Sequence, residues 1–310
     1  MARYVAKRLA WSLFVLVGVT FVIHTVMSLV PGDPTVVLLG DAATAEQRAA
    51  LRAELGLDRP FLVRYADYLG GIVRGDLGLS YRNRRPVVEE IADAYPATLK
   101  LSAAAMAVTV LLGLPAGILS AVRRNRIEDY GITVVSLLGL SMPVFLIGLL
   151  LIYYLAYRWP IFPVGGMDDG LVSYVLPAFT LALTSIAMVS RMTRASMLEV
   201  LGEDFIRTAR AKGLAEARVV NRHALKAAFI PVLTVLGLQI GLLLGGAVIT
   251  ETVFAWPGIG RLMVAGIRTR DLYLVQGCVL VMAASFVLIN LLTDLAYTLV
   301  DPRVRHGARA

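Results

Sequence analysis

Charged residues are scarce in this sequence of 310 residues. Only 17% of its positions carry a charge, whereas 58% are hydrophobic, and the mean hydropathy is +0.73. Soluble domains have about a quarter charged residues and about half apolar residues. This balance excludes an ordinary soluble globular protein and indicates an integral membrane protein.

Cysteine and histidine are also too few for common metal and redox sites. The single cysteine, Cys278, falls inside an apolar run, so no disulfide can form within the chain. The three histidines, His24, His223 and His306, are far apart and lack the spacing of metal ligands. We therefore predict no metal site and no redox role.

Motifs for catalysis and nucleotide hydrolysis are missing as well. The sequence has no HExxH pair and no paired carboxylates within an apolar run, so we predict no catalytic residue. It also has no GxxxxGK[ST] phosphate loop, and the GxG of "WPGIGR" lacks the third glycine of a dinucleotide fingerprint. The chain is therefore predicted not to be an enzyme, to bind no cofactor itself and to depend on another protein for energy from ATP.

Apolar runs long enough to cross a bilayer, which takes about 20 residues, are the main feature that is present. We expect six transmembrane helices, near Leu9–Val30, Leu99–Val122, Ile132–Tyr157, Tyr174–Val189, Phe229–Ile249 and Leu274–Leu299. The first resembles a signal peptide because basic residues precede it, but its apolar core is too long and no small-x-small cleavage site follows. The fold class is therefore an all-α polytopic membrane protein.

The distribution of lysine and arginine predicts the orientation of these helices. If the N-terminus is cytoplasmic, and the long segment after the first helix is left aside, 17 of these residues fall in cytoplasmic segments. Four, Arg158, Arg261, Arg268 and Arg270, fall in short outer loops. Because cytoplasmic loops are the ones enriched in Lys and Arg, both termini are predicted to be cytoplasmic. The same bias explains the formal charge of +8, and no nucleic-acid partner is expected.

The segment after the first helix is long enough to form a small extracytoplasmic domain. Thr44 and Gln47 have the spacing of a capping box, and Gly56 is placed to end the helix that they begin. Apolar residues at helical spacing from Phe61 to Val73 predict a second, amphipathic helix. Two alternatives remain for this domain, namely a cap packed on the membrane helices or a surface that contacts the solute.

A basic segment, "GEDFIRTARAKG", lies between the fourth and fifth apolar runs. Acidic residues at its start and basic residues at its end favour a short helix, and Gly213 can adopt the left-handed conformation that ends it. The small side chains of Ala209 and Ala211 would allow another protein to approach closely. The alternative is a solvated basic loop held by anionic membrane lipid.

Two further patterns concern the fifth helix and the segment after it. Gly237, Gly241 and Gly245 recur every four residues, which favours close helix packing or sliding of helices at a gate. In "ETVFAWPGIG", the Pro-Gly pair predicts a turn at the outer end of the helix, where tryptophan suits an interface. The residues of interest there are Glu251, Phe254, Trp256, Pro257 and Gly258. We expect a re-entrant or capping segment near the outer mouth that contacts solute, and the alternative is an aromatic anchor at the membrane interface.

Several stretches, taken in order along the chain, resemble one known family. They are "LVPGDP", "GDLGLSY", "SMPVF", "RMTRASMLEVLGEDF", "RTARAKG" followed by "RHALK" and "IPV", "TETVFAWPGIGRL" and "DPRVR". Together they resemble the permease subunit of bacterial dipeptide/oligopeptide ABC importers, the subunit with a large loop after helix one. The general E-A-A pattern of importer coupling loops is matched only at Ala209, Gly213 and Leu225, whereas the variant found in peptide permeases is matched closely.

The resemblance implies the type I ABC importer permease fold. Residues 1–30 would form a cytoplasmic tail and helix one, 31–97 an extracytoplasmic insert, 98–300 the permease core of helices two to six, and 301–310 a cytoplasmic tail. The core includes a cytoplasmic coupling loop at 191–228. Within that loop the residues that would contact the ATPase are Asp204, Phe205, Arg207, Thr208, Ala209, Arg210, Ala211, Lys212, Gly213 and Leu214.

The resemblance also implies an activity and a set of partners. The chain would form half of a translocation pathway for di- and oligopeptides in the bacterial cytoplasmic membrane. Its partners would be a homologous second permease subunit, two ATP-binding cassette subunits that bind ATP and Mg, and an extracytoplasmic solute-binding protein. The alternatives are another solute for the same machinery, such as nickel or a metal chelate, a haem-like compound or a glycopeptide. A stand-alone channel or carrier, or a membrane receptor, is the alternative outside this class.

Overall fold

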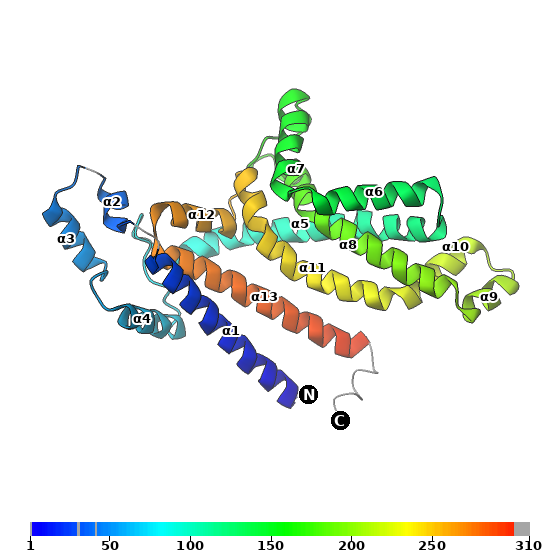
Figure 1. The fold of residues 1–310 in the computed structure, drawn as a ribbon, viewed down its shortest axis with the longest axis horizontal. Helices are drawn as coiled ribbons and strands as arrows, with labels where there is room; N and C mark the ends of the chain where they lie inside the picture. The colour runs from blue at the N-terminus through cyan, green and yellow to red at the C-terminus, as the bar shows by residue number, and fades with distance from the viewer. Residues whose placement is uncertain (1, 30–31, 41, 301–310) are drawn as a thin grey trace. The chain divides into compact units, whose positions relative to one another are not determined.

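A computed structural model describes residues 2–29, 32–40 and 42–300 of the chain (Figure 1). Within these ranges the chain forms helices and no β-strand, apart from one isolated bridge between Leu79 and Pro86. The predicted tail at 301–310, with its basic residues and the "DPRVR" stretch, lies outside the described residues. The chain divides into two compact units, 1–98 with 255–287 and 99–254 with 288–310.

The first unit contains the segment that follows the first transmembrane helix. Its helices are α1 (Ala2–Leu29), α2 (Pro34–Leu39), α3 (Ala45–Glu54), α4 (Phe61–Val73), the start of α5 (Val87–Val122), α12 (Ile259–Thr269) and most of α13 (Leu272–Val300). The capping box of Thr44 and Gln47 is confirmed, and Gly56, with a φ of 65°, lies directly after the C-terminal cap of this helix, as predicted. The second predicted helix of this segment is confirmed as α4.

A buried carboxylate joins distant parts of the first unit. Asp271 is fully buried and accepts hydrogen bonds from the Ser80 hydroxyl at 2.6 Å and the Tyr81 backbone N–H at 2.7 Å. It also accepts one from the backbone N–H of Leu274, in the first turn of α13, at 3.1 Å. An apolar cluster lies in the same unit and is formed by Leu77, Val87, Ile91, Ile259, Leu274 and Cys278. The unit therefore extends beyond the predicted insert at 31–97 and includes residues 255–287.

The second unit is organised around α8 (Val175–Leu201), which packs against α6, α7 and α11. Its other elements are α6 (Ile127–Ser141), α7 (Val144–Leu151), the π-helix Ile152–Arg158, the 3₁₀ turn Gly170–Tyr174, α9 (Asp204–Ala211), α10 (Glu216–Arg218), the π-helix Val219–Ala224 and α11 (Leu225–Val253). The last two thirds of α5, from residue 99, and the end of α13, from residue 288, also belong to this unit.

Two glycines of α5 allow a close approach to α8 in the second unit. A Cβ atom at Gly117 would lie 2.5 Å from both the Ser190 carbonyl oxygen and Cβ of Thr193, on α8. A Cβ atom at Gly113, one turn earlier, would lie 3.2 Å from Val189. Small residues four positions apart let two helix backbones come this near, so α5 and α8 form a tightly packed pair.

Five helices of the described chain are long and apolar enough to cross a membrane, or six if a bent pair counts as one span. The prediction of one continuous helix over Ile132–Tyr157 is wrong. The helices Ile127–Ser141 and Val144–Arg158 meet at an angle of 106°. Met142 is extended there, with ψ of 134°, because the ring of Pro143 disfavours helical geometry in the residue before it.

Several other helices extend beyond the span boundaries predicted from the sequence. The second span begins at Val87 instead of Leu99, and the fourth continues to Leu201. The fifth follows directly from helical residues that begin at Glu216, so that one run covers Glu216–Val253. Helices extend past the apolar core because their polar ends are hydrated or packed on neighbouring elements, which hydropathy alone does not reveal.

Candidate coupling site

The short helix α9 is the centre of the candidate site. Asp204 lies in its first turn and Arg210 in its last, the order that complements the helix dipole. Lys212 is its C-terminal cap, and Gly213 has a φ of 75°, which glycine adopts without the steric cost that a Cβ atom brings. The predicted short helix and the left-handed conformation of Gly213 are thus both confirmed.

One face of α9 is packed against its own chain. Ile206 is fully buried and Ala209 is 6% exposed. Both belong to an apolar cluster, here called the coupling cluster, that comprises Ala121, Met197, Ile206, Ala209, Val219, Val220, Ala224 and Ala228. The expectation that Ala209 faces a docking protein is therefore wrong. Positions 206 and 209 lie three residues apart on one helix face, and that face is already occupied.

The other face of α9 is exposed. It carries Asp204, Phe205, Arg207, Thr208, Arg210 and Ala211, and Lys212 and Gly213 continue it, whereas Leu214 is half-buried against the coupling cluster. Phe205 has 47% of its surface exposed, although it is the largest apolar side chain of the helix. An exposed aromatic ring among charged groups is typical of the anchor residues of protein interfaces.

An ion pair holds the turn after α9. The Arg210 guanidinium donates to both carboxylate oxygens of Glu216, from Nη2 at 2.7 Å and from Nε at 3.1 Å. Both side chains are about half exposed, so this pair contributes little to the free energy of unfolding. Its two-pronged geometry nevertheless orients α10 relative to α9.

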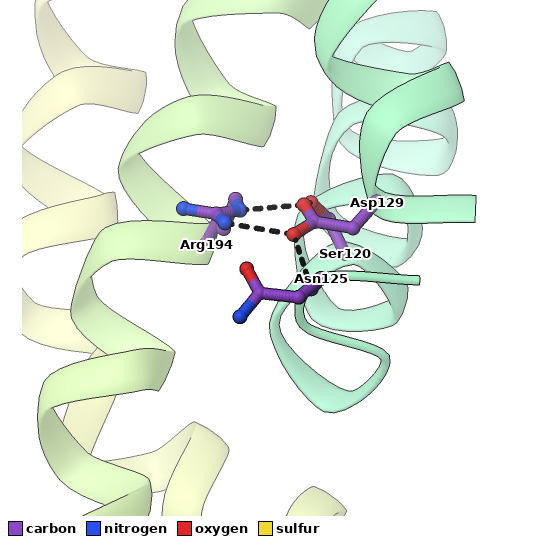
Figure 2. A network of polar contacts seen from close by, with 4 residues as sticks. All are labelled: Ser120, Asn125, Asp129 and Arg194. Atoms are coloured by element: carbon purple, nitrogen blue, oxygen red, sulfur yellow. Dashed lines mark hydrogen bonds and ion pairs between the residues drawn. The ribbon is translucent and has the colours of Figure 1, made fainter. Parts of the chain in front are cut away.

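A second polar network lies in the same unit and is shown in Figure 2. The carboxylate of Asp129 accepts hydrogen bonds from Arg194 Nε at 2.7 Å and Nη2 at 2.8 Å, and from the Asn125 backbone N–H at 2.9 Å. The Ser120 hydroxyl also donates to it. The side chain of Asp129 is only 3% exposed and that of Arg194 32%. The network fixes the turn between α5 and α6 to α8.

This network was not among the sequence predictions, although its residues left a signal. Asp129 is an acidic residue in the first turn of an apolar helix, and Arg194 lies within the long helix α8. The position next to Ser120 is Ala121, which belongs to the coupling cluster. The end of α5 therefore contacts both the ion pair and the packed face of α9.

Arg194→Ala is expected to lower the free energy of unfolding by about 2–3 kcal/mol. Breaking a fully buried ion pair costs about 3–5 kcal/mol because one charge remains buried, and the partial exposure of Arg194 reduces this figure. The measurement is unfolding of the purified chain by graded SDS in mixed micelles. The double variant Asp129→Leu/Arg194→Met is the control, since it leaves no stranded charge and should recover most of the loss. Equal losses in both variants would contradict the role assigned to the pair.

The residues assigned to the outer mouth are mostly buried. Glu251 and Trp256 are fully buried and Phe254 is 1% exposed. Trp256 donates a hydrogen bond from Nε1 to the Ala97 carbonyl oxygen at 2.9 Å. The interpretation of Trp256 as an aromatic anchor at the membrane interface is therefore wrong, because such an anchor is exposed to lipid.

The turn that follows places the remaining two residues of this group. Pro257 is exposed, and Gly258 is buried and precedes the first turn of α12. The backbone N–H of Ile259, at the start of that helix, donates to the Thr98 hydroxyl at 2.9 Å. Hydrogen bonds to residues of the first unit thus stabilise the turn predicted from the Pro-Gly pair. Of the five residues, only Pro257 is open to an external contact.

Only some of the three regularly spaced glycines of α11 pack against a neighbouring helix. Gly237 is buried, and a Cβ atom there would collide with the Thr293 side chain of α13. Gly241 is buried too, but Gly245 is exposed and has no atom within 4 Å of where its Cβ would be. Residues four apart on an α-helix drift by about 40° per step, so the third glycine no longer faces the same neighbour.

No group of three or more side chains suited to metal binding gathers in the part of the chain that the structure describes. The arrangement of α9 instead suits the transmission of movement between helices. The packed face of α9 contacts α5, α8 and the start of α11 through the coupling cluster, and its exposed face presents Phe205. A displacement of α9 would therefore move three long helices.

Two family models match most of the chain. The model described as binding-protein-dependent transport system inner membrane component matches residues 113–306. A second model, described as the N-terminal part of the same kind of membrane component, matches residues 1–102. Together the two matches leave only residues 103–112 and 307–310 uncovered, and the match at 113–306 includes the whole of α9.

Similar curated proteins extend over the full length of the chain. The dipeptide transport system permease protein DppB of Escherichia coli (strain K12) is 41% identical over 99% of each chain. The di/tripeptide transport system permease protein DppB of Pseudomonas aeruginosa is 42% identical over 99% of each chain. The glutathione transport system permease protein GsiC of Escherichia coli O6:H1 is 41% identical over 99% of this chain and 100% of its own.

Solved structures resemble the fold at low sequence identity. A chain of the inward-facing MetNI methionine ABC transporter has a TM-score of 0.57 at 18% identity and covers 68% of this chain and 96% of its own. A chain of an amino acid ABC transporter has a TM-score of 0.52 at 18% identity, with coverage of 69% and 94%. These likenesses concern the fold alone.

Proposed function

This chain belongs to the family of binding-protein-dependent transport system inner membrane components, and we propose that it forms half of an ATP-driven translocation pathway for di- and oligopeptides. It is a multi-pass inner-membrane subunit of an ABC importer. The observation that carries the solute class is identity of 41–42% to dipeptide and di/tripeptide permeases along 99% of both chains. The similar identity to a glutathione permease keeps a modified peptide as the second candidate.

The proposed partners follow from what this chain lacks and what it exposes. Its sequence has no phosphate-binding loop, so two ATP-binding cassette subunits would bind and hydrolyse ATP. A second, homologous permease would complete the pathway, and an external binding protein would deliver the solute. The exposed face of α9 is the surface on which we place the ATPase contact.

The packing of α9 supports a mechanism for the coupling of ATP hydrolysis to transport. Ile206 and Ala209 bury the inner face of the helix, so α9 cannot swing freely without exposing apolar surface. A push on Phe205 is then transmitted to α5, α8 and α11 as a shift of packed helices. Interfaces of this kind have discrete arrangements, which suits a pathway that opens to one side at a time.

Reconstitution tests the proposed solute class. The permease pair, the ATPases and the binding protein are assembled in vesicles. ATP is supplied on the side of the membrane where the ATPases are bound, and uptake of labelled dialanine is measured. We expect uptake that depends on ATP and on the binding protein. Mass spectrometry of ligands bound to the co-purified binding protein should show peptides. A metal chelate or haem-like compound there, without dialanine uptake, would overturn the peptide assignment but not the importer assignment.

We propose that both termini and α9 are cytoplasmic and that residues 31–97 are outside. Ala50 and Ala215 are exposed, whereas Cys278 is fully buried and should react slowly in the unmodified chain. In intact cells an impermeant thiol reagent is expected to label Ala50→Cys and not Ala215→Cys. The reverse pattern would overturn this orientation, and labelling of the unmodified chain is the background to subtract.

A further inference from the structure

A basic cavity lies within the first unit and has no part in the proposed transport mechanism. Its volume is about 300 Å³, and it is lined by residues of α1, α2, α3, α4 and α12 and by Tyr81. Three arginines contribute to its wall, Arg52, Arg64 and Arg270, against one carboxylate, Asp33. The cavity therefore has an excess of positive charge.

Among the residues that the structure describes, carboxylate partners are found for one of the three arginines. Arg52 pairs with Asp33 at 2.8 Å and with Asp58 at 3.0 Å. The guanidinium groups of Arg64 and Arg270 have no hydrogen-bond or carboxylate partner within the described residues, and Nε of Arg64 is buried without an acceptor. A buried donor of this kind is rare in folded proteins and indicates a ligand or water that satisfies it.

The guanidinium group of Arg270 lies against Gly32 at the wall of the cavity. Arg270 has a φ of 56°, uncommon for a residue with a side chain, and its guanidinium lies directly over Gly32, where any Cβ atom would collide with it. Tyr81 adds a neutral donor, because burial raises the pKa of its hydroxyl. Two guanidinium groups and a phenol hydroxyl form a donor set that suits an oxyanion.

The position of the cavity along α1 indicates where that oxyanion comes from. The apolar span Ala10–Leu29 has 20 residues, which at about 1.5 Å per residue matches a hydrocarbon core of about 30 Å. Met27 and Ser28, in the last turn of this span, line the cavity. The cavity is therefore level with the head groups of the leaflet at which α1 ends.

Large apolar side chains leave room for the rest of a lipid beside the cavity. Phe21, Val22, Val26 and Leu29 are each between 43% and 76% exposed on α1. An acyl chain can follow this exposed surface while its head group enters the cavity. A small free anion would gain nothing from these residues, so their exposure favours a phospholipid.

We propose that Arg64 and Arg270 bind the phosphate of a phospholipid in the leaflet at which α1 ends. The lipid would neutralise the unpaired charge and satisfy Nε of Arg64. It would also join α1 to α4 and α12 at the membrane surface. The site depends on neither the solute nor the orientation of the chain.

Native mass spectrometry of the assembled, delipidated importer complex with added phosphatidylglycerol tests this assignment. The wild type is expected to bind one lipid tightly at this site. Arg64→Gln and Arg270→Asn should each weaken that binding roughly 10- to 100-fold, the loss expected for hydrogen bonds to a charged group. Asparagine is chosen at 270 because it tolerates a positive φ. Arg64→Lys keeps the charge without Nε and should retain part of the affinity.

Arg82→Gln is the matched control, since Arg82 is exposed in the same unit and the net charge changes equally. Its lipid affinity should equal that of the wild type. The thermal unfolding midpoint of Arg64→Gln without lipid should be no lower than that of the wild type, because no described residue pairs with the Arg64 guanidinium. Unchanged lipid affinity in both cavity variants would overturn the proposal. Displacement of the lipid by millimolar inorganic phosphate or dialanine would show instead that the cavity takes a free oxyanion.

Discussion

Phe205→Asp is expected to abolish solute uptake while the chain still inserts and folds. Phe205 is 47% exposed on α9, and its neighbour Ile206 holds the helix in the coupling cluster. Removal of a central aromatic anchor from an interface typically costs about 2 kcal/mol or more, and a carboxylate adds a desolvation penalty. Affinity for the ATPase should therefore fall about 30-fold or more.

Uptake, ATPase activity and subunit stoichiometry in reconstituted vesicles are the measurements. We expect uptake to stop, with the ATPases either dissociated or no longer stimulated by the loaded binding protein. Arg222→Gln is the control, because Arg222 is exposed outside α9 and the substitution changes the net charge by the same amount, so it should keep uptake and stimulation. If Phe205→Asp retains full uptake and full stimulation, α9 is not the coupling element.

Substitution on the packed face of α9 should give a different defect. Ala209→Trp overfills the coupling cluster, which typically costs about 1–3 kcal/mol, and it should displace α9 without removing Phe205. Weakened coupling is then expected together with lower stability of the chain. Phe205→Asp should leave stability unchanged, so unfolding in mixed micelles distinguishes the two faces of the helix.

Trp256→Ala is expected to destabilise the chain by about 3–5 kcal/mol, the usual cost of removing a buried tryptophan. Trp256 has no exposed surface and donates to the Ala97 carbonyl oxygen. Truncation therefore leaves both a cavity and an unsatisfied acceptor. Unfolding by graded SDS in mixed micelles, together with the yield of inserted protein, measures the loss.

Trp256→Phe is the matched control, since it keeps most of the ring volume and removes only the Nε1 donor. Its cost should be about 1–2 kcal/mol. A contact with solute would give another result: Trp256→Ala would then fold as the wild type does and change only the apparent affinity for solute. That outcome would restore the outer-mouth interpretation of this residue.

Local sequence patterns were sufficient for much of the helical architecture. Apolar runs located the spans because each must match the thickness of the bilayer regardless of its neighbours. The capping box at Thr44 and the left-handed Gly213 depend only on residues a few positions away. The family was recognisable from short motifs, and full-length similarity to dipeptide permeases confirms it.

Features that join distant residues were decided by the tertiary structure alone. Asp129 and Arg194 are 65 positions apart, and no local pattern pairs them. The sequence offered Ala209 as a contact for another protein, but only packing shows that Ala209 and Ile206 lie on the inner face of α9. Hydropathy indicated one continuous third span although the chain bends at Pro143. For Trp256 the sequence left a membrane anchor and a solute contact as alternatives, whereas the structure shows that its side chain is buried. The periodicity of apolar residues and their free energy of transfer into a membrane are properties of a single segment. Which way a helix face points, and whether it is buried, depends on the other segments that pack against it.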